Sequence, residues 1–189
     1  MVSEISIILA SLLLLSCSNK APSIDSCNKL YESNQTEDCF NCAKEYLKSH
    51  PDDLEGMKVY AKCAQSTNEL NEVQLYMKSR SFELFEHNID YFMLYGEVAM
   101  RLKEHGTANT SYRVGRQIDS TYYNLNYMAA YSLFKFREED NRHKQSSKDL
   151  NEILYLVDLE LKYHPENKNA QSFKAVLKQA SDSLASINQ

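Results

Sequence analysis

The sequence contains few residues that make tight turns, with four glycines and three prolines among 189 residues. A sheet protein with many hairpins depends on such residues to reverse its chain, whereas the abundant leucine, alanine, lysine and glutamate favour helices. The composition therefore predicts an all-α protein. Because 43% of the residues are apolar and the chain is short, we expect a single domain around one core.

The sequence also lacks a concentration of positive charge. Its 21 Lys and Arg are outnumbered by 26 Asp and Glu, which gives a formal net charge of −5. No basic block is present that could neutralise a run of phosphates. We therefore expect no nucleic-acid partner.

Catalytic signatures are missing as well. The chain contains no HExxH zinc motif, no GxSxG nucleophile turn and no glycine-rich phosphate-binding loop. The five histidines are scattered, and His50 and His164 directly precede a proline where a helix is expected to end, which favours a structural role. The acidic run 138–140 is typical of a solvated surface. We expect a protein that is not an enzyme and that needs no cofactor.

An apolar run from Ile5 to Leu15 has the length of a signal-peptide core and is too short to cross a bilayer as a helix. It ends in Leu-Leu-Ser-Cys at residues 14–17, which resembles the lipobox of bacterial lipoproteins. The resemblance implies that residues 1–16 are a cleaved lipoprotein signal peptide and that Cys17 is the lipidated first residue of the mature chain. Residues 17–23 would then form a lipidated linker. The alternative is an ordinary signal peptide in which Cys17 is incidental.

Lipidation of Cys17 would attach the protein to a membrane of the bacterial cell envelope. In a cell with two membranes, the residue after the acylated cysteine influences sorting. Ser18 stands there instead of an aspartate, and this resembles the signal of lipoproteins that are sorted to the outer membrane. The expected location is therefore the periplasmic side of the outer membrane, or the single membrane of a cell that has only one.

Four further cysteines follow Cys17, namely Cys27, Cys39, Cys42 and Cys63. An even number of cysteines in an exported chain predicts two disulfides, for which three pairings are possible. A zinc site is less well supported, because only Cys39 and Cys42 are closely spaced. A thioredoxin-like redox pair would need a preceding strand, and no strand pattern is present. No metal site is therefore expected.

Apolar residues recur at helical spacing along most of the chain. The predicted helices cover residues 21–33, 36–49, 54–65, 68–85, 89–104, 108–118 and 122–137, followed by one with a core face over 150–161 and one with a core face over 173–187. A polar, charge-dense stretch over residues 137–149 interrupts the pattern. It is predicted to protrude as a loop or an extended helix pair.

The helical pattern repeats along the chain. Small or short residues recur at intervals of 34, 35 and 34 residues, at Cys27, Ala61, Gly96 and Ala130. This period resembles that of the tetratricopeptide (TPR) family. The resemblance implies that residues 24–189 form an α-solenoid of about four helix-turn-helix pairs plus a C-terminal capping helix.

The TPR resemblance also implies a pairing of the cysteines. In that family the small residue of the first helix contacts the small residue of the second helix of the same pair, which implies a disulfide between Cys27 and Cys39. The second helix also packs on the first helix of the next pair, which implies a disulfide between Cys42 and Cys63. Both bonds would strengthen an end of the solenoid that lacks a neighbouring repeat.

Helical-repeat proteins usually bind partners on a concave surface lined by the first helix of each pair. In the register of this sequence, the expected groove residues are Met93, Glu97, Met100, Arg101, Tyr127, Tyr131, Phe134 and Lys135. Exposed aromatic residues of this kind would anchor a partner. A stripe of Tyr and Met at helical spacing is, however, also typical of a core.

From these features we expect an envelope-anchored, TPR-like lipoprotein that acts as a protein-binding scaffold or assembly factor. Its partner would be another protein or a peptide segment in the cell envelope. Two alternatives remain open. One is an inhibitor or immunity-type protein that binds one secreted enzyme, and the other is a thiol- or metal-binding protein.

Overall fold

The computed structural model describes residues 21–80, 85–139 and 147–187, and these residues form helices and turns without any strand. The helices are α2 (Ile24–Glu32), α3 (Thr36–Ser49), α4 (Leu54–Thr67), α5 (Leu70–Ser79), α7 (Ile89–Arg101), α8 (His105–Ile118), α9 (Leu125–Glu139), α10 (Ser147–Tyr163) and α11 (Lys168–Ile187). The all-α prediction is therefore confirmed. The predicted signal peptide over residues 1–16, the lipidation site Cys17 and most of the charged stretch after residue 139 lie outside the described residues.

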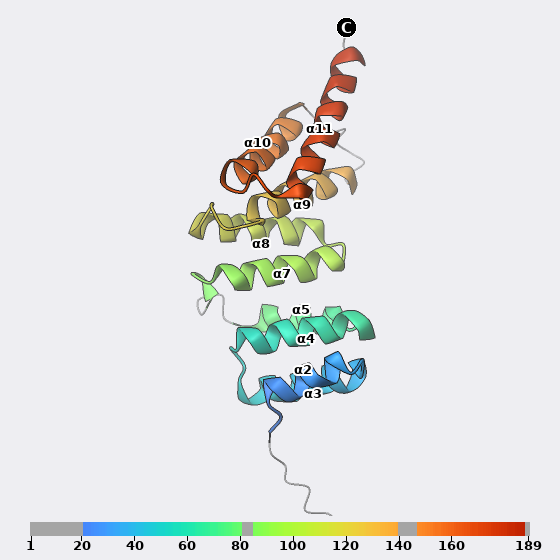
Figure 1. Ribbon diagram of the computed structural model, residues 1–189, viewed down its shortest axis with the longest axis vertical. Coiled ribbons are helices and arrows are strands. Elements are labelled where there is room, and N and C mark those ends of the chain that lie inside the picture. Colours follow the sequence, from blue (N-terminus) through green and yellow to red (C-terminus); the bar gives the residue numbers. More distant parts are fainter. Residues whose placement is uncertain (1–20, 81–84, 140–146, 188–189) are drawn as a thin grey trace, which may run out of the picture.

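The helices stack in sequence order along one axis, from α2 and α3 at one end to α11 at the other (Figure 1). Four successive pairs are formed by α2 with α3, α4 with α5, α7 with α8 and α9 with α10, and α11 packs on α10. This arrangement confirms the predicted solenoid of four pairs and a final capping helix. Among the described helices, none combines the length and the hydropathy needed to cross a membrane.

Capping side chains explain where several helices begin. Ser23, Asp53 and Asn88 precede α2, α4 and α7, and each side chain accepts a hydrogen bond from a backbone N–H in the first turn of its helix. The chain reverses direction between helices at residues with left-handed backbone. These are Asn34, Asn68, Lys103 and Asn124. Local chemistry thus accounts for helix boundaries that the sequence predicts to within about three residues. The exception is the helix predicted over residues 68–85, which ends at Ser79 because the backbone of Arg80 is extended.

The small residues of the repeat allow the two helices of a pair to approach closely. Gly96 on α7 lies directly against the ring of Tyr112 on α8, and a Cβ atom at residue 96 would be 2.4 Å from that ring. Cys27, two repeats before Gly96, and Ala130, one repeat after it, are fully buried. Close helix contact is therefore the physical origin of the period of about 34 residues.

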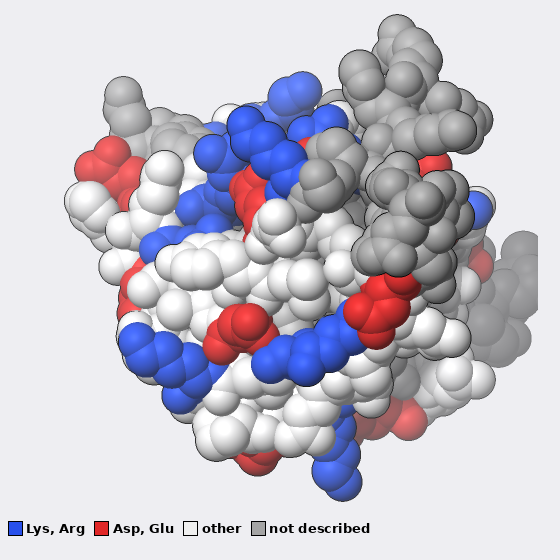
Figure 2. All heavy atoms as spheres, turned by 90° about the horizontal axis from the view of Figure 1, so that it is seen from above, with Lys and Arg blue, Asp and Glu red and all other residues white. Residues whose placement is uncertain are grey.

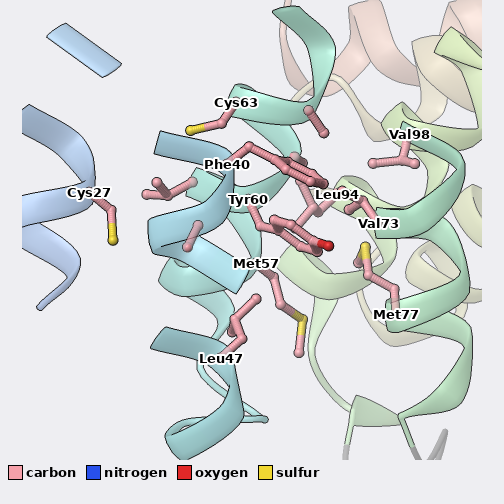
Figure 3. Close-up of a cluster of buried hydrophobic side chains, with 14 of the residues drawn as sticks. Cys27, Phe40, Leu47, Met57, Tyr60, Cys63, Val73, Met77, Leu94 and Val98 are labelled. Carbon is pink, nitrogen blue, oxygen red and sulfur yellow. The ribbon is translucent and has the colours of Figure 1, made fainter. Parts of the chain in front are cut away.

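Buried side chains form two clusters along the axis. The first joins α2 to α7, and its residues point inward from several helices (Figure 3). Within it, the rings of Phe40 and Tyr60 stack with their centroids 4.8 Å apart, and the Tyr60 hydroxyl donates a hydrogen bond to Glu72. The second cluster joins α7 to α11 and includes Leu125, Ile153 and other apolar side chains. Each junction between pairs thus contributes to one of two cores.

The disulfides differ from the predicted pairing. The structure joins Cys27 to Cys42 and Cys39 to Cys63, with Cα–Cα distances of 5.4 and 5.8 Å, which are usual for disulfides. The predicted bonds, Cys27 with Cys39 and Cys42 with Cys63, are therefore wrong. The first observed bond joins α2 to α3, and the second joins α3 to α4.

The distance of each cysteine from the turns explains the observed pairing. In an antiparallel helix pair, residues at equal distance from the turn lie at the same height along the axis. Cys27 lies seven residues before Asn34 (34 − 27), while Cys42 lies eight residues after it (42 − 34) and Cys39 only five (39 − 34). Cys39 in turn lies further from the α3–α4 turn than Cys42 does, at the height of Cys63. The TPR resemblance identifies which helices meet, but it does not settle these heights.

Candidate protein-binding groove

A groove runs along the first helices of three successive pairs and has a volume of about 500 Å³. We call it the first-helix groove. It is lined by Asn28 of α2, by Glu55, Lys58, Val59, Ala61, Lys62 and Gln65 of α4, by Leu70 of α5, and by Leu94, Glu97, Val98 and Arg101 of α7. Like the predicted binding surface, it is lined mainly by first helices, but it spans the first three pairs, whereas the predicted groove residues belong to the third and fourth pairs.

The floor of the first-helix groove is apolar and well packed. Val59, Leu94 and Val98 are almost fully buried and belong to the first core cluster. Leu94 and Val98 lie one turn apart on α7, so that the same helix face supplies both the core and the floor. A partner would therefore contact a surface that is held in place by the core beneath it.

Paired charges line one end of the groove, near the starts of α4 and α7. The Lys58 Nζ lies 2.7 Å from Glu55 Oε1 and 4.0 Å from Asp90 Oδ2. Asp90 also accepts a hydrogen bond from the Tyr122 hydroxyl, just before α9. The hydrogen bond to Glu55 raises the pKa of Lys58, and the hydrogen bond to Asp90 raises the pKa of Tyr122 to about 12. At this end of the groove, the positive charge of Lys58 is therefore already paired with the carboxylates of Glu55 and Asp90.

Unpaired cations line the other end. Within the described part of the chain, neither Lys62 nor Arg101 forms an ion pair, although the Lys62 Nζ lies 5.1 Å from the centroid of the Tyr31 ring. Loss of surrounding water raises the pKa of Glu97, which lies between the two ends, while Arg101 and Lys58 act in the opposite direction. The groove therefore has an apolar floor, paired charges at one end and unpaired positive charges at the other.

The groove residues predicted on α7 have two different environments. Glu97 and Arg101 line the first-helix groove, as expected from the register. Met93 and Met100 are half-buried and pack against the second core cluster. Lys62, which also lines the groove, was not predicted, although it lies one repeat before Glu97 (97 − 62 = 35) and follows from the same register.

The predicted groove residues on α9 lie apart from the first-helix groove. Tyr127, Tyr131 and Phe134 surround Phe173 of α11, with ring centroids 6.0, 5.6 and 5.4 Å away. Lys135 pairs with Glu138 at 2.6 Å and lies beside the rings of Tyr131 and Phe134. At the fourth pair, α11 thus packs on side chains that were expected to hold a partner.

Helix α11 is also tied to α10 through polar groups. The Lys174 Nζ lies 2.6 Å from Asp158 Oδ1. In the view from above, towards the α11 end, Lys and Arg side chains are interspersed with Asp and Glu around uncharged surface (Figure 2). This end therefore presents charges of both signs.

No protein-family model matches the chain, and no curated protein matches it. Solved structures do. The crystal structure of MamA protein superimposes with a TM-score of 0.66 at 11% identity and covers 84% of this chain and 80% of that chain. The chain therefore has a TPR-like fold. YrrB, a TPR protein with an unusual peptide-binding site, superimposes with a TM-score of 0.60 at 12% identity over 79% of this chain and 71% of that chain.

A second MamA crystal structure gives the same TM-score of 0.66 at 11% identity, with 82% of this chain and 84% of that chain covered. At such low identity these similarities establish the TPR-like fold alone, because folds host many functions and function depends on particular sites. The first-helix groove is therefore the basis for any statement about what this TPR-like chain binds.

Proposed function

We propose that this TPR-like protein is a non-enzymatic scaffold that binds an extended segment of another protein in the first-helix groove. The observation that carries the proposal is the groove itself, which spans three helix pairs and in which charged side chains of α4 and α7 border a buried apolar floor. An apolar floor provides binding energy, while charges at the rim orient the partner. The similarity to YrrB supports a peptide segment as the partner.

We also propose that the protein is a lipoprotein of the bacterial envelope, anchored through Cys17. The lipobox-like residues 14–17 support lipidation, and two disulfides suit an oxidising compartment. Ser23, which caps α2, follows Cys17 by only six residues (23 − 17). A short tether would hold the disulfide-bonded end of the solenoid close to the membrane and leave α11 at the distal end.

Photo-crosslinking in intact cells tests the groove. A photoreactive residue replaces Lys62 or Arg101 in the full chain, and the same residue at Lys168 on α11 serves as the control. We expect one or a few discrete crosslinked partners from positions 62 and 101, and none of them from position 168. The same partners from all three positions, or none from the groove, would contradict the proposal. A single secreted enzyme bound in a one-to-one complex would instead favour an inhibitor.

Lipidation is tested separately with Cys17→Ser. Cells are fed a clickable palmitate analogue, and the label and membrane association of the protein are measured. We expect both to be lost in the variant and retained in Cys27→Ser. Equal labelling of the two variants would rule out Cys17 as the anchor.

A further inference from the structure

A second hollow lies between the second helices α5 and α8, with α7 beneath it, and has a volume of about 660 Å³. Its floor is formed by Phe92, Tyr95 and Val114, of which Phe92 is almost fully buried and the other two are half-buried. On α7, Phe92 and Tyr95 lie on a different face from Leu94 and Val98, which form the floor of the first-helix groove. The two hollows are therefore separate sites. We call this one the second-helix hollow.

A leucine projects from the wall of the second-helix hollow. Leu75 on α5 is 66% exposed, more than any other large apolar side chain in the described part of the chain. A single exposed leucine is common on protein surfaces. Here, however, Leu75 borders the second-helix hollow, which is apolar and larger in volume than the first-helix groove. A projecting side chain and a recess that could receive one therefore lie in the same surface patch.

Opposite charges stand on the two walls. Lys78 follows Leu75 by about one turn of α5, and it forms no ion pair with any described carboxylate. Glu104 stands on the other wall, in the turn before α8, where it accepts a hydrogen bond from Gln74 at 2.7 Å. One wall therefore carries an unpaired cation and the other an anion bonded to a neutral amide.

A patch with a projection, a recess and opposite charges on opposite walls is complementary to a second copy of itself related by a two-fold axis. We propose that the second-helix hollow is the interface of a symmetric homodimer. Leu75 of each copy enters the hollow of the other, and Lys78 of each copy pairs with Glu104 of the other. Charge complementarity at the rim sets the register, while Leu75 is the apolar anchor.

The dimer leaves the first-helix groove of each copy open, because that groove lies on another face of α7. Two grooves in one particle would allow two segments of a partner to bind at once, which increases the apparent affinity without any new contact. The dimer itself does not depend on the groove binding anything.

Sedimentation equilibrium of the full chain tests the dimer, in a nonionic detergent whose density is matched by the solvent. The 189-residue chain has a mass of 21.8 kDa before signal-peptide cleavage and lipidation, and we expect a concentration-dependent shift from the mass of one mature chain towards the mass of two. Lys78→Glu and Glu104→Lys should each weaken the dimer at least about tenfold, because each places like charges in contact. An equimolar mixture of the two variants should restore dimers, since each contact then joins opposite charges again.

The apolar contact is tested with Leu75→Asp, and Val176→Asp on α11 is the matched control because Val176 is also more than half exposed. We expect Leu75→Asp to abolish the dimer and Val176→Asp to leave it intact. Circular dichroism at 222 nm verifies that all variants remain folded. A monomer at every concentration, equal weakening by the two aspartate variants, or no recovery in the mixture of charge variants would overturn the proposal.

Discussion

The N-terminal end of the solenoid is held by covalent bonds, whereas the C-terminal end is held by side-chain packing and hydrogen bonds. Two disulfides connect α2 to α3 and α3 to α4, and no cysteine follows Cys63 in the sequence. Both ends face the same physical problem, because a terminal repeat has no neighbour to cover its apolar surface. The short α2, nine residues long, offers little area for packing, and covalent bonds compensate for it.

At the C-terminal end, a buried carboxylate replaces the usual capping residue of α9. Glu160 of α10 is fully buried. It accepts hydrogen bonds from the backbone N–H groups of Asn124 and Asn126, at 2.8 and 3.2 Å, and from the Asn167 side chain at 2.9 Å. Asn167 in turn caps the start of α11. One side chain therefore joins the starts of two helices, and a negative charge at the positive end of α9 is favourable.

The largest effect is expected for Phe173→Ala, which removes the ring that three aromatic side chains of α9 surround. Loss of a buried phenylalanine costs about 4 kcal/mol of unfolding free energy, measured by urea unfolding. Val176→Ala on the same helix is the control, because Val176 is 56% exposed. Similar losses for the two variants would mean that α11 is not held by the aromatic cluster.

Glu160→Ala should lower the free energy of unfolding by about 3 kcal/mol, since it leaves buried N–H groups without an acceptor. Faster hydrogen exchange is expected in α9 and at the start of α11, but not in α2 to α4. Glu152→Ala, at an exposed acid on the same helix, provides the comparison. Uniformly faster exchange throughout the chain would show that the two ends are not independent.

Removing the Cys39–Cys63 bond by Cys39→Ala with Cys63→Ala should cost about 2 to 3 kcal/mol through the entropy of the unfolded chain. The increase in the rate of hydrogen exchange should be confined to α2, α3 and α4, whereas Glu160→Ala should increase the rate only near the other end of the solenoid. Peptide mapping without reductant checks the pairing. Fragments that link Cys27 to Cys39 would contradict it.

The smallest effect is expected for Tyr91→Phe, at the junction between the two regions. The Tyr91 hydroxyl donates a hydrogen bond to the Met77 carbonyl at 2.9 Å, and burial raises its pKa to about 12. Because the folded pKa lies above the unfolded value of about 10, the contribution of this group is present below pH 10 and is lost as the pH rises through 12. The variant should lose about 1 kcal/mol at pH 8 and show a shallower alkaline decline.

The control for Tyr91→Phe is Tyr123→Phe, because Tyr123 is 54% exposed. Urea unfolding is repeated for both variants at intervals from pH 8 to pH 11. If Tyr91→Phe and the unmodified protein lose stability equally over this range, the buried hydroxyl is not responsible for the alkaline decline.

Much of the fold could be predicted because its signals are local. The predicted helix over residues 36–49 coincides with α3, whose neighbour α4 begins where Pro51 and Asp53 require a new helix. The candidate site was predicted less completely. The repeat register predicts Glu97 and Arg101 as groove residues, whereas Lys62 was not predicted, because the prediction rested on the aromatic-rich helices of the third and fourth pairs.

The sequence by itself determined the helices, their pairing and the period of about 34 residues, since apolar spacing, caps and turn residues act between neighbours in the chain. The tertiary structure alone decided which cysteines meet, that α11 packs on Tyr127, Tyr131 and Phe134, and that Glu160 caps α9 from 36 residues away. These outcomes depend on the height and rotation of each helix against its neighbours. Side-chain packing sets both, and a pattern of residue types along one chain does not encode them.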